Sequence, residues 1–312
     1  MAFVRTRPVA ALAVLSLVAA CAGGSTSASL DAPTSTASSA ACASHASLTD
    51  QPYVANGVPA QRLDLYQPPD VGCRLVPLVV WVHGGGWSVG DKRNAMAEKV
   101  SLWEDEGWAV ASLNYRLTER SAPAADRVEA PTHNQDVAAA LGWLVQNASR
   151  LGIDAHRIAL LGHSAGAGIV AAIAADPSYL AAVDLAPADL QCVGPLDTEG
   201  FDIAAVVAGG GTQAQLYRTV FGADESRWRE LSPLTHLGDA PVPDLFLVRR
   251  GEVARRAQVD AFATAARAAD ANVTVVDLPA FSHEDVNRRI GDPTDHELTP
   301  ALETFLSTCF SS

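Results

Sequence analysis

The stretch Gly162-His163-Ser164-Ala165-Gly166 decides the fold of this 312-residue chain. A strand-like apolar segment, Arg157–Leu161, precedes it, and a helix-forming run of small residues, Ala167–Ala175, follows it. A serine on a tight strand-to-helix turn has a strained backbone and an exposed hydroxyl, and flanking glycines let the strand and the helix approach closely. The N-terminus of the helix offers backbone N–H groups to a developing oxyanion. The pattern therefore predicts a nucleophile at Ser164.

A glycine run, His83-Gly84-Gly85-Gly86-Trp87, directly follows the apolar segment Leu78–Val82. A turn that needs positive φ angles would explain the glycines. A loop whose unpaired N–H groups point at a substrate oxygen would explain them too. The oxyanion hole of an acyl-transfer enzyme takes N–H groups from such a loop and from the residue after the nucleophile. Because both loops occur in the expected order, each behind its own strand, we favour an oxyanion hole formed by Gly85, Gly86 and Ala165.

With three further segments, these motifs resemble the α/β-hydrolases of the hormone-sensitive-lipase-like and feruloyl-esterase-like (BD-FAE type) carboxylesterase group. The further segments are Gly90-Asp91-Lys92, Asn114-Tyr115-Arg116-Leu117 and Ser282–Asn287. The resemblance implies a mostly parallel central sheet flanked by helices. It also implies a serine hydrolase that cleaves small or short-chain carboxylic esters and needs no cofactor. It does not specify the substrate, because this fold hosts many chemistries.

Short apolar segments alternate with helical patterns through residues 51–312, which we interpret as one α/β-hydrolase domain. Parallel strands covered on both faces are short and apolar, and strand–helix alternation gives a parallel sheet. The segment Pro177–Asp202 is expected to be an insertion, either a small cap over the pocket or a structural loop. The predicted strands are Leu78–Val82, Ala109–Asn114, Ile158–Gly162, Ala204–Ala208, Leu245–Val248 and Val273–Leu278, and the predicted helices are Asn94–Glu106, His133–Asn147, Ala257–Ala269 and Thr299–Cys309.

The general base is predicted to be His283, which follows the last predicted strand on a short loop. It would take the proton of Ser164 and return it to the leaving group. Ligands bind beyond the carboxyl ends of the strands in such sheets, and both residues follow predicted strands. His83 belongs to the glycine loop and His163 to the serine turn, so we expect structural roles for them. No Cys/His cluster has zinc-ligand spacing, so no metal site is expected.

The acid of the triad usually follows the strand before the last helix–strand pair in the group that the chain resembles, in a G-x-x-D pattern. The corresponding stretch here is Leu245–Arg255, in which Ala254 stands at the aspartate position. Glu252 is the nearest carboxylate and is therefore the predicted acid, although it could equally be a surface carboxylate paired with a neighbouring arginine. Weaker candidates for the acid are Asp260, Asp277 and Glu284.

Two alternatives to an esterase follow from the same residues. One is an amidase resembling kynurenine formamidases, which share a glycine loop and a serine turn. The other is a catalytically weak, lipid-anchored binding protein, which the missing aspartate at Ala254 would favour. The net charge of −13 argues against nucleic-acid binding. The oligomeric state is not predicted.

The N-terminus has the features of a targeting segment. Arg5 and Arg7 are basic, Val9–Ala20 is apolar but too short to span a membrane, and Val18-Ala19-Ala20-Cys21 resembles a bacterial lipoprotein cleavage site. We expect residues 1–21 to hold a signal peptide with Cys21 acylated, although an ordinary secretory signal would fit the same pattern. The protein would then be anchored on the outer face of the cell membrane. Residues 22–50 are rich in Ser, Thr and Ala and are expected to form a disordered tether.

Four cysteines remain besides Cys21, and an even number in an oxidising compartment suggests two disulfides. Three connectivities are possible, and four free thiols are the alternative. We favour Cys42–Cys73, which would pin the tether to an edge hairpin, and Cys192–Cys309, which would pin the last helix.

Overall fold

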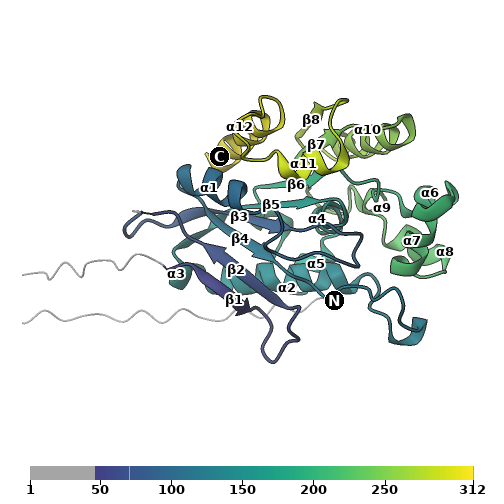
Figure 1. The fold of residues 1–312 in the computed structure, drawn as a ribbon, viewed down its shortest axis with the longest axis horizontal. Helices are drawn as coiled ribbons and strands as arrows, with labels where there is room; N and C mark the ends of the chain where they lie inside the picture. Colours follow the sequence, from purple (N-terminus) through teal and green to yellow (C-terminus); the bar gives the residue numbers. More distant parts are fainter. Residues whose placement is uncertain (1–45, 70, 312) are drawn as a thin grey trace, which may run out of the picture. The chain divides into compact units, whose positions relative to one another are not determined.

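The computed structural model describes residues 46–69 and 71–311. They contain an eight-stranded sheet in the order β1-β2-β4-β3-β5-β6-β7-β8 (Figure 1). The β1–β2 and β2–β4 pairs are antiparallel, and every later neighbouring pair is parallel. The predicted α/β fold class is thus confirmed. The strands are β1 (Leu48–Pro52), β2 (Arg62–Tyr66), β3 (Val76–Val82), β4 (Ala109–Leu113), β5 (Ile153–His163), β6 (Cys192–Leu196), β7 (Asp244–Arg249) and β8 (Val273–Asp277).

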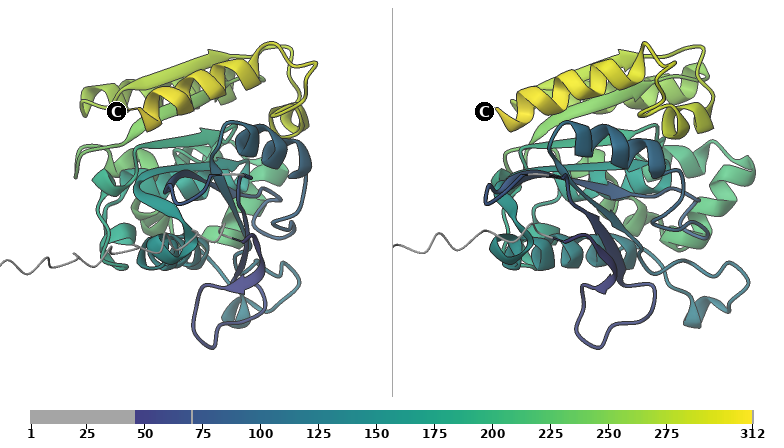
Figure 2. Two further views of the ribbon diagram at one scale, coloured as in Figure 1. Left: turned by 90° about the vertical axis from the view of Figure 1, so that its left-hand side faces the viewer. Right: turned by 60° about the vertical axis from the view of Figure 1, so that its left-hand side comes forward.

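Helices cover both faces of the sheet, as the apolar central strands require. Alternate residues of β3 join two separate cores. Val80 belongs to the core that includes buried residues of α2, α4 and α10, whereas Trp81 belongs to the core that includes residues of α1, α11 and α12. Figure 2 shows α12 lying along one face of the sheet. The helices are α1 (Ala97–Asp105), α2 (Thr132–Gln146), α3 (Ala148–Leu151), α4 (Ala165–Ala175), α5 (Ser178–Ala181), α6 (Ile203–Ala208), α7 (Gly211–Phe221), α8 (Glu225–Glu230), α9 (Pro233–His236), α10 (Val253–Ala268), α11 (His283–Arg288) and α12 (Leu298–Phe310).

One predicted strand is wrong. The segment Ala204–Ala208 belongs to helix α6, and the strand at this place in the sheet is β6, inside the segment expected to be an insertion. Asp202 caps α6 by accepting a hydrogen bond from the N–H of Ala205 at 3.0 Å, which is a helix start signal. Pro195 made β6 hard to recognise, since proline is rare in central strands. It is tolerated here because β6 pairs with β7 only at Cys192 and Val193.

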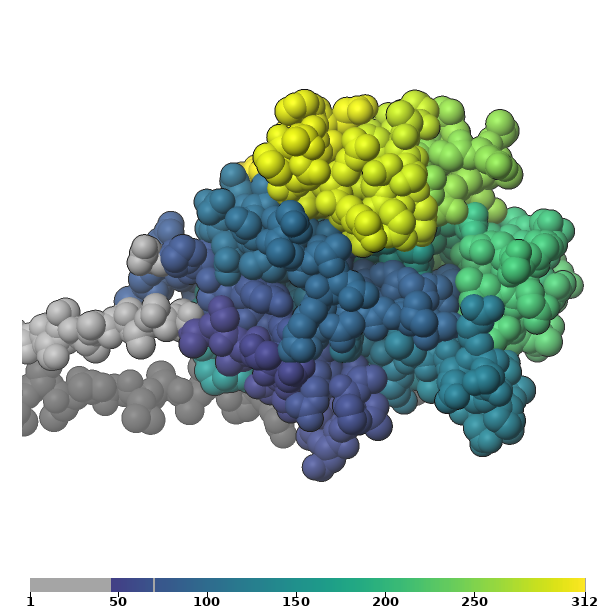
Figure 3. All heavy atoms as spheres, in the orientation of Figure 1, coloured from purple at the N-terminus to yellow at the C-terminus, as the bar shows by residue number. Residues whose placement is uncertain are grey.

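The insertion lies one strand later than predicted. Helices α6–α9 all fall between β6 and β7. In Figure 3 this segment, coloured green, lies at the right-hand edge of the molecule, below the C-terminal residues in yellow. Helix α7 contributes Gln213, Leu216 and Tyr217 to a cavity beside Ser164, so the insertion forms a wall of the site.

The structure contains the expected disulfide between Cys192, the first residue of β6, and Cys309, near the end of α12. Cys42 and Cys21 lie outside the described residues, as do the predicted signal peptide and most of the tether. Residues 48–50, expected at the end of the tether, instead belong to β1. None of the helices in residues 46–69 and 71–311 is long and apolar enough to cross a membrane.

Candidate active site

Ser164 lies on a sharp turn between β5 and α4, with φ 58° and ψ −115°. A residue with a side chain rarely adopts a positive φ, so the turn is strained. The neighbouring glycines make it possible. A Cβ atom on Gly162 would lie 2.5 Å from the carbonyl oxygen of Gly166, and one on Gly166 would lie 2.2 Å from that of Val82. The turn therefore fits tightly against the end of β3.

The glycine loop after β3 lies against this turn. Gly85 and Gly86 have φ angles of 110° and 58°, and a Cβ atom on Gly84 would lie 3.0 Å from the Cβ of Ser164. Within the described part of the chain, the N–H groups of Gly85 and Gly86 have no hydrogen-bond acceptor. Ala165 begins α4, where backbone N–H groups lack an intrahelical acceptor. The three predicted oxyanion residues thus lie around Ser164, with N–H groups available to a ligand.

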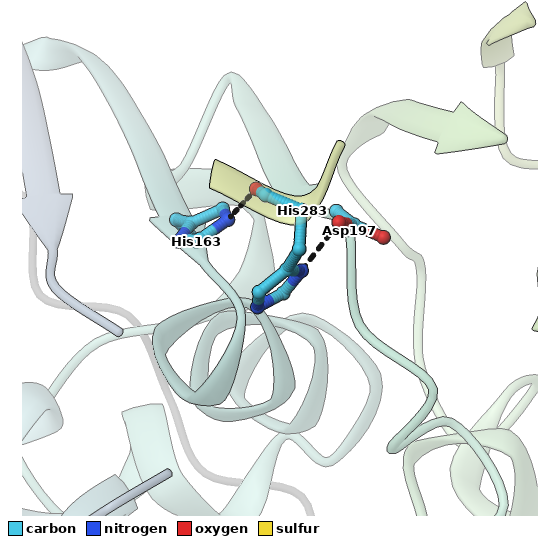
Figure 4. Close-up of side chains that lie close together, drawn as sticks. All are labelled: His163, Asp197 and His283. Carbon is cyan, nitrogen blue, oxygen red and sulfur yellow. Dashed lines mark hydrogen bonds and ion pairs between the residues drawn. The ribbon is translucent and has the colours of Figure 1, made fainter. Parts of the chain in front are cut away.

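His283 begins helix α11, and its imidazole bridges two other residues. The Oγ–H of Ser164 donates to Nε2 of His283 at 2.8 Å. On the other side of the ring, Nδ1–H of His283 donates to Oδ2 of Asp197 at 2.6 Å, as Figure 4 shows. A capping box formed by Ser282 and Asp285 fixes the start of α11. The three side chains therefore form a chain of hydrogen bonds with the arrangement of a Ser-His-Asp triad.

Asp197, and not Glu252, is the carboxylate beside His283. Asp197 directly follows β6 and is buried, whereas Glu252 is exposed as the N-cap residue of α10. The assignment of Glu252 is therefore corrected. It rested on counting from β7, and it failed because β6 was taken for part of an insertion. The signal in the sequence was the apolar run Cys192–Leu196, which an aspartate follows directly.

Two arginines compensate the buried charge of Asp197. Arg250 donates through Nε to Oδ2, and Arg255 donates through Nε to Oδ1 at 2.8 Å. Burial by itself would raise the pKa of Asp197, but the hydrogen bond from His283 and the charges of Arg255 and Arg250 hold it at about 2. Asp197 is thus ionised at neutral pH, as the partner of an imidazolium must be.

The other two histidines near Ser164 have structural contacts. Nδ1–H of His83 donates to the carbonyl oxygen of Gly84 at 2.7 Å, and the ring of His83 stacks on Tyr115. His163 donates from Nε2 to the backbone carbonyl of His283 at 2.9 Å (Figure 4). Burial, together with the nearby His283, lowers the pKa of His163 to about 3, so it stays neutral. His163 therefore holds the backbone of the residue that contacts Ser164.

His163, Asp197 and His283 have residue types that ligate metals, and their ligand atoms lie within 4.8 Å of one another. Each of these residues is already hydrogen-bonded within the site. Arg250 and Arg255 also place two positive charges on Asp197. These contacts favour a hydrogen-bonded triad over a cation site.

Two cavities meet at Ser164 and His283. One has a volume of about 350 Å³, and its lining includes the apolar residues Trp87, Leu216 and Tyr217 and polar residues such as Glu199. The second has a volume of about 450 Å³ and lies between the glycine loop and α11. Two cavities beside one nucleophile can hold the two halves of a molecule that is cleaved between them.

Comparison with known proteins agrees with this geometry. Residues 63–214 match the BD-FAE family model. Esterase LipQ of Mycobacterium tuberculosis is 27% identical over 250 residues, which are 76% of this chain and 57% of LipQ. Carboxylesterase NlhH of the same species is 39% identical over 112 residues, which are 35% of this chain and 32% of NlhH. The chain thus spans about a third to about half of the length of these curated relatives.

Solved structures share the fold. A truncated carbohydrate esterase from gut microbiota has a TM-score of 0.69 at 17% identity, with 87% of this chain and 100% of that chain covered. An inhibited esterase B from Lactobacillus rhamnosis has a TM-score of 0.67 at 20% identity, with 84% and 87% covered. The sheet of this chain therefore has the α/β-hydrolase arrangement.

Proposed function

We propose that this chain, an α/β-hydrolase whose residues 63–214 match the BD-FAE family, is a carboxylesterase-type serine hydrolase. The observation that carries the proposal is the pair of hydrogen bonds that link Ser164, His283 and Asp197. The names of LipQ and NlhH, an esterase and a carboxylesterase, support the same reaction class.

In the proposed reaction, Ser164 attacks the carbonyl carbon of an ester while Nε2 of His283 takes the hydroxyl proton. The N–H groups of Gly85, Gly86 and Ala165 stabilise the oxyanion of the tetrahedral intermediate. The imidazolium then protonates the leaving alcohol, which departs and leaves an acyl group on Ser164. A water molecule, activated by the same histidine, hydrolyses this acyl-enzyme and restores the free serine.

A preference for small or short-chain acyl groups is part of the proposal. The lining of the cavity of about 350 Å³ includes Glu199 and Gln213, which hydrogen-bond to each other, and Arg255. A long alkyl chain would have to displace these paired polar groups or lie against them without solvent, which costs free energy. A short acyl group avoids this contact.

The alternative of a binding protein without turnover has lost its main support. It rested on the absence of an aspartate at Ala254, and Asp197 provides a carboxylate at the histidine instead. An amidase resembling kynurenine formamidases would use the same residues, so the ratio of amide to ester hydrolysis distinguishes it.

The experiment that tests the proposal is labelling of the full chain with a fluorophosphonate, followed by peptide mass spectrometry. We expect phosphonylation at Ser164 in the wild type and its loss in His283→Ala. Hydrolysis of a panel of p-nitrophenyl esters of increasing acyl length, beside matched anilides, would then define the reaction. A folded protein that gives no adduct would refute the proposal and favour a binding role.

Export and lipid anchoring are a separate proposal, which the sequence before residue 46 supports. The basic start, the apolar segment and Cys21 together suggest an acylated lipoprotein. Metabolic labelling with a clickable palmitate in a bacterial host that expresses the full chain would test it. Incorporation that persists in Cys21→Ala would count against acylation at this residue.

A further inference from the structure

The segment after β7 carries two arginines where the sequence pattern predicted an acid. Arg250 directly follows β7, and Arg255 lies in the first turn of α10. Their side chains are 11% and 18% exposed, and both line the cavity beside Ser164. This segment therefore supplies positive charge to the site, while the carboxylate comes from the end of β6.

Arg255 contacts the segment after β6 at three points. Its Nε donates to Oδ1 of Asp197 at 2.8 Å, its Nη2 to the backbone carbonyl of Asp197 at 2.9 Å, and its Nη1 to Oε2 of Glu199 at 2.9 Å. All three nitrogens are thus used within the protein. Asp197 has a φ of 62°, a conformation that persists only where surrounding contacts impose it. The planar fork of Arg255 is the contact that reaches both its backbone and its carboxylate.

Arg250 has a different relation to the triad. It donates to Oδ2 of Asp197, the oxygen that also accepts from His283, and its Nη2 lies 3.0 Å from Nδ1 of His283. An arginine can only donate, so Nδ1 can pair with Arg250 only when it carries no proton. In that tautomer Nε2 would carry the proton and could not take another from Ser164. Arg250 therefore competes with Asp197 for Nδ1, and Arg255 does not.

We propose that Arg255 is a positioning residue for the hydrolysis. It holds the Asp197 carboxylate within hydrogen-bond distance of His283 and so favours the tautomer in which Nδ1 carries the proton and Nε2 accepts from Ser164. The inference rests on the proposed function, because the tautomer affects a rate only if Ser164 attacks. Glu199 takes part by fixing the far side of the same guanidinium.

The charged residues around His283 come from four neighbouring parts of the chain. Asp197 follows β6, Arg250 follows β7, Arg255 lies on α10, and Glu284 is the next residue of α11. His163, at the end of β5, is neutral because burial lowers its pKa to about 3. Arg255 is one of two positive charges in this set, and it is the one that does not contact the imidazole.

The first test compares Arg255→Ala and Arg255→Lys with Arg256→Ala. Arg256 is the matched control, because it is the next residue of α10 and pairs with Asp277 instead. We expect Arg255→Ala to lower kcat on a short p-nitrophenyl ester by roughly 100-fold with little change in KM, since small misplacements of catalytic groups have effects of this size. Arg255→Lys should recover only part of the loss, because an ammonium cannot bind as a fork. Arg256→Ala should match the wild type.

The rate of phosphonylation separates positioning from substrate binding. Diisopropyl fluorophosphate is too small to need the polar residues that line the cavity. A positioning role therefore predicts that its reaction with Arg255→Ala slows in parallel with kcat. A raised KM with an unchanged phosphonylation rate would overturn the inference and make Arg255 a substrate contact. Thermal unfolding shows whether each variant is folded. If Arg255→Ala does not fold, the same comparison of kcat and phosphonylation rate is made with Arg255→Lys.

A double-mutant cycle tests whether Arg255 acts through Asp197. If it does, adding Arg255→Ala to Asp197→Asn should not lower kcat further, because residues that act as one unit are not additive. Multiplicative losses would contradict the inference.

A spectroscopic measurement tests the inference without any turnover. The proton between Nδ1 of His283 and Asp197 should give a far-downfield ¹H NMR resonance that is present in the wild type and Arg256→Ala, and lost or shifted in Asp197→Asn and Arg255→Ala. Its absence from the wild type, or its persistence unchanged in Arg255→Ala, would overturn the positioning role. If the resonance behaves as expected but the wild type reacts with neither phosphonate nor ester, the proposed function fails and the positioning of Asp197 by Arg255 stands.

Discussion

Nε2 of His283 lies 2.8 Å from Oγ of Ser164, although the two residues are 119 positions apart in the chain. One follows β5 and the other starts the helix after β8. The carboxyl ends of parallel strands meet at one edge of a sheet, which is where such sheets bind ligands. The approach of the two side chains therefore depends on the sheet order and on the hydrogen bond from His163 to the His283 carbonyl.

The identity of the acid gives the first prediction. Replacing Asp197 by Asn leaves a side chain of the same shape but removes the charge that stabilises the imidazolium and orients its tautomer. We expect kcat to fall by about 10⁴-fold, with a much smaller change in KM. Steady-state kinetics on a short p-nitrophenyl ester would measure both constants.

Glu252→Gln is the matched control for Asp197→Asn, because it makes the same change at the carboxylate that the sequence pattern favoured. Glu252 is exposed at the start of α10, so the kcat and KM of Glu252→Gln should equal those of the wild type. Loss of activity in Glu252→Gln together with an active Asp197→Asn would reverse the assignment of the acid.

The sequence was sufficient to predict the parts of the site that local backbone chemistry dictates. A glycine on each side of Ser164 and a glycine run after β3 are needed where backbones approach closely, so these residues can be recognised in the chain itself. The α/β class followed from the alternation of apolar and helical segments. His283 could be placed because the loop after β8 is short.

The acid could not be placed in the same way, because a carboxylate can reach the histidine from more than one strand end. Asp197 follows a strand that contains Gly194 and Pro195, two residues that argue against a central strand. The run Ile203–Ala208 is apolar and short, and such runs do not distinguish a strand from a helix by periodicity. Because one strand was misassigned, the acid was predicted after β7, whereas the structure has it after β6.

The second prediction concerns the glycine after the nucleophile. A Cβ atom on Gly166 would lie 2.2 Å from the carbonyl oxygen of Val82, a backbone atom that cannot move alone. Gly166→Ala should therefore destabilise the fold by several kcal/mol and lower phosphonylation of Ser164. A Cβ atom on Gly168, in the same helix, would lie 3.3 Å from the Trp87 ring and 3.6 Å from Oγ1 of Thr198, both side-chain atoms, so Gly168→Ala should change stability by no more than about 1 kcal/mol. Urea unfolding would compare the two variants, and equal stabilities would contradict the close approach at Gly166.

The third prediction concerns the Cys192–Cys309 disulfide, which links residues 117 positions apart. Closing a loop of this length restricts the unfolded chain, and the entropic account gives a stabilisation of about 4 to 5 kcal/mol. The double variant Cys192→Ala/Cys309→Ala should therefore unfold at lower urea concentration. Cys192 is at the opposite end of β6 from Asp197, so kcat at 25 °C should change little. A large loss of kcat in a folded double variant would show that the disulfide also sets the position of the acid.

The fourth prediction is a loss of stability in mild acid that His133 contributes. Burial lowers the pKa of His133 to about 4, below its usual 6.5, and its Nδ1 has no hydrogen-bond partner among the described residues. Between pH 4 and 6.5 the unfolded chain binds more protons than the folded one, so stability falls as the pH decreases through this range, by on the order of 3 kcal/mol for this residue. His133→Gln removes the titrating group and keeps an N–H donor for Oγ1 of Thr118, which lies 3.0 Å from Nε2 of His133. The measurement is the free energy of unfolding at intervals from pH 4 to pH 7, which should depend less on pH in His133→Gln than in the wild type. The control is His296→Gln, a change at an exposed histidine, which should keep the wild-type pH dependence. The same slope in both variants would mean that His133 is not held neutral by its burial.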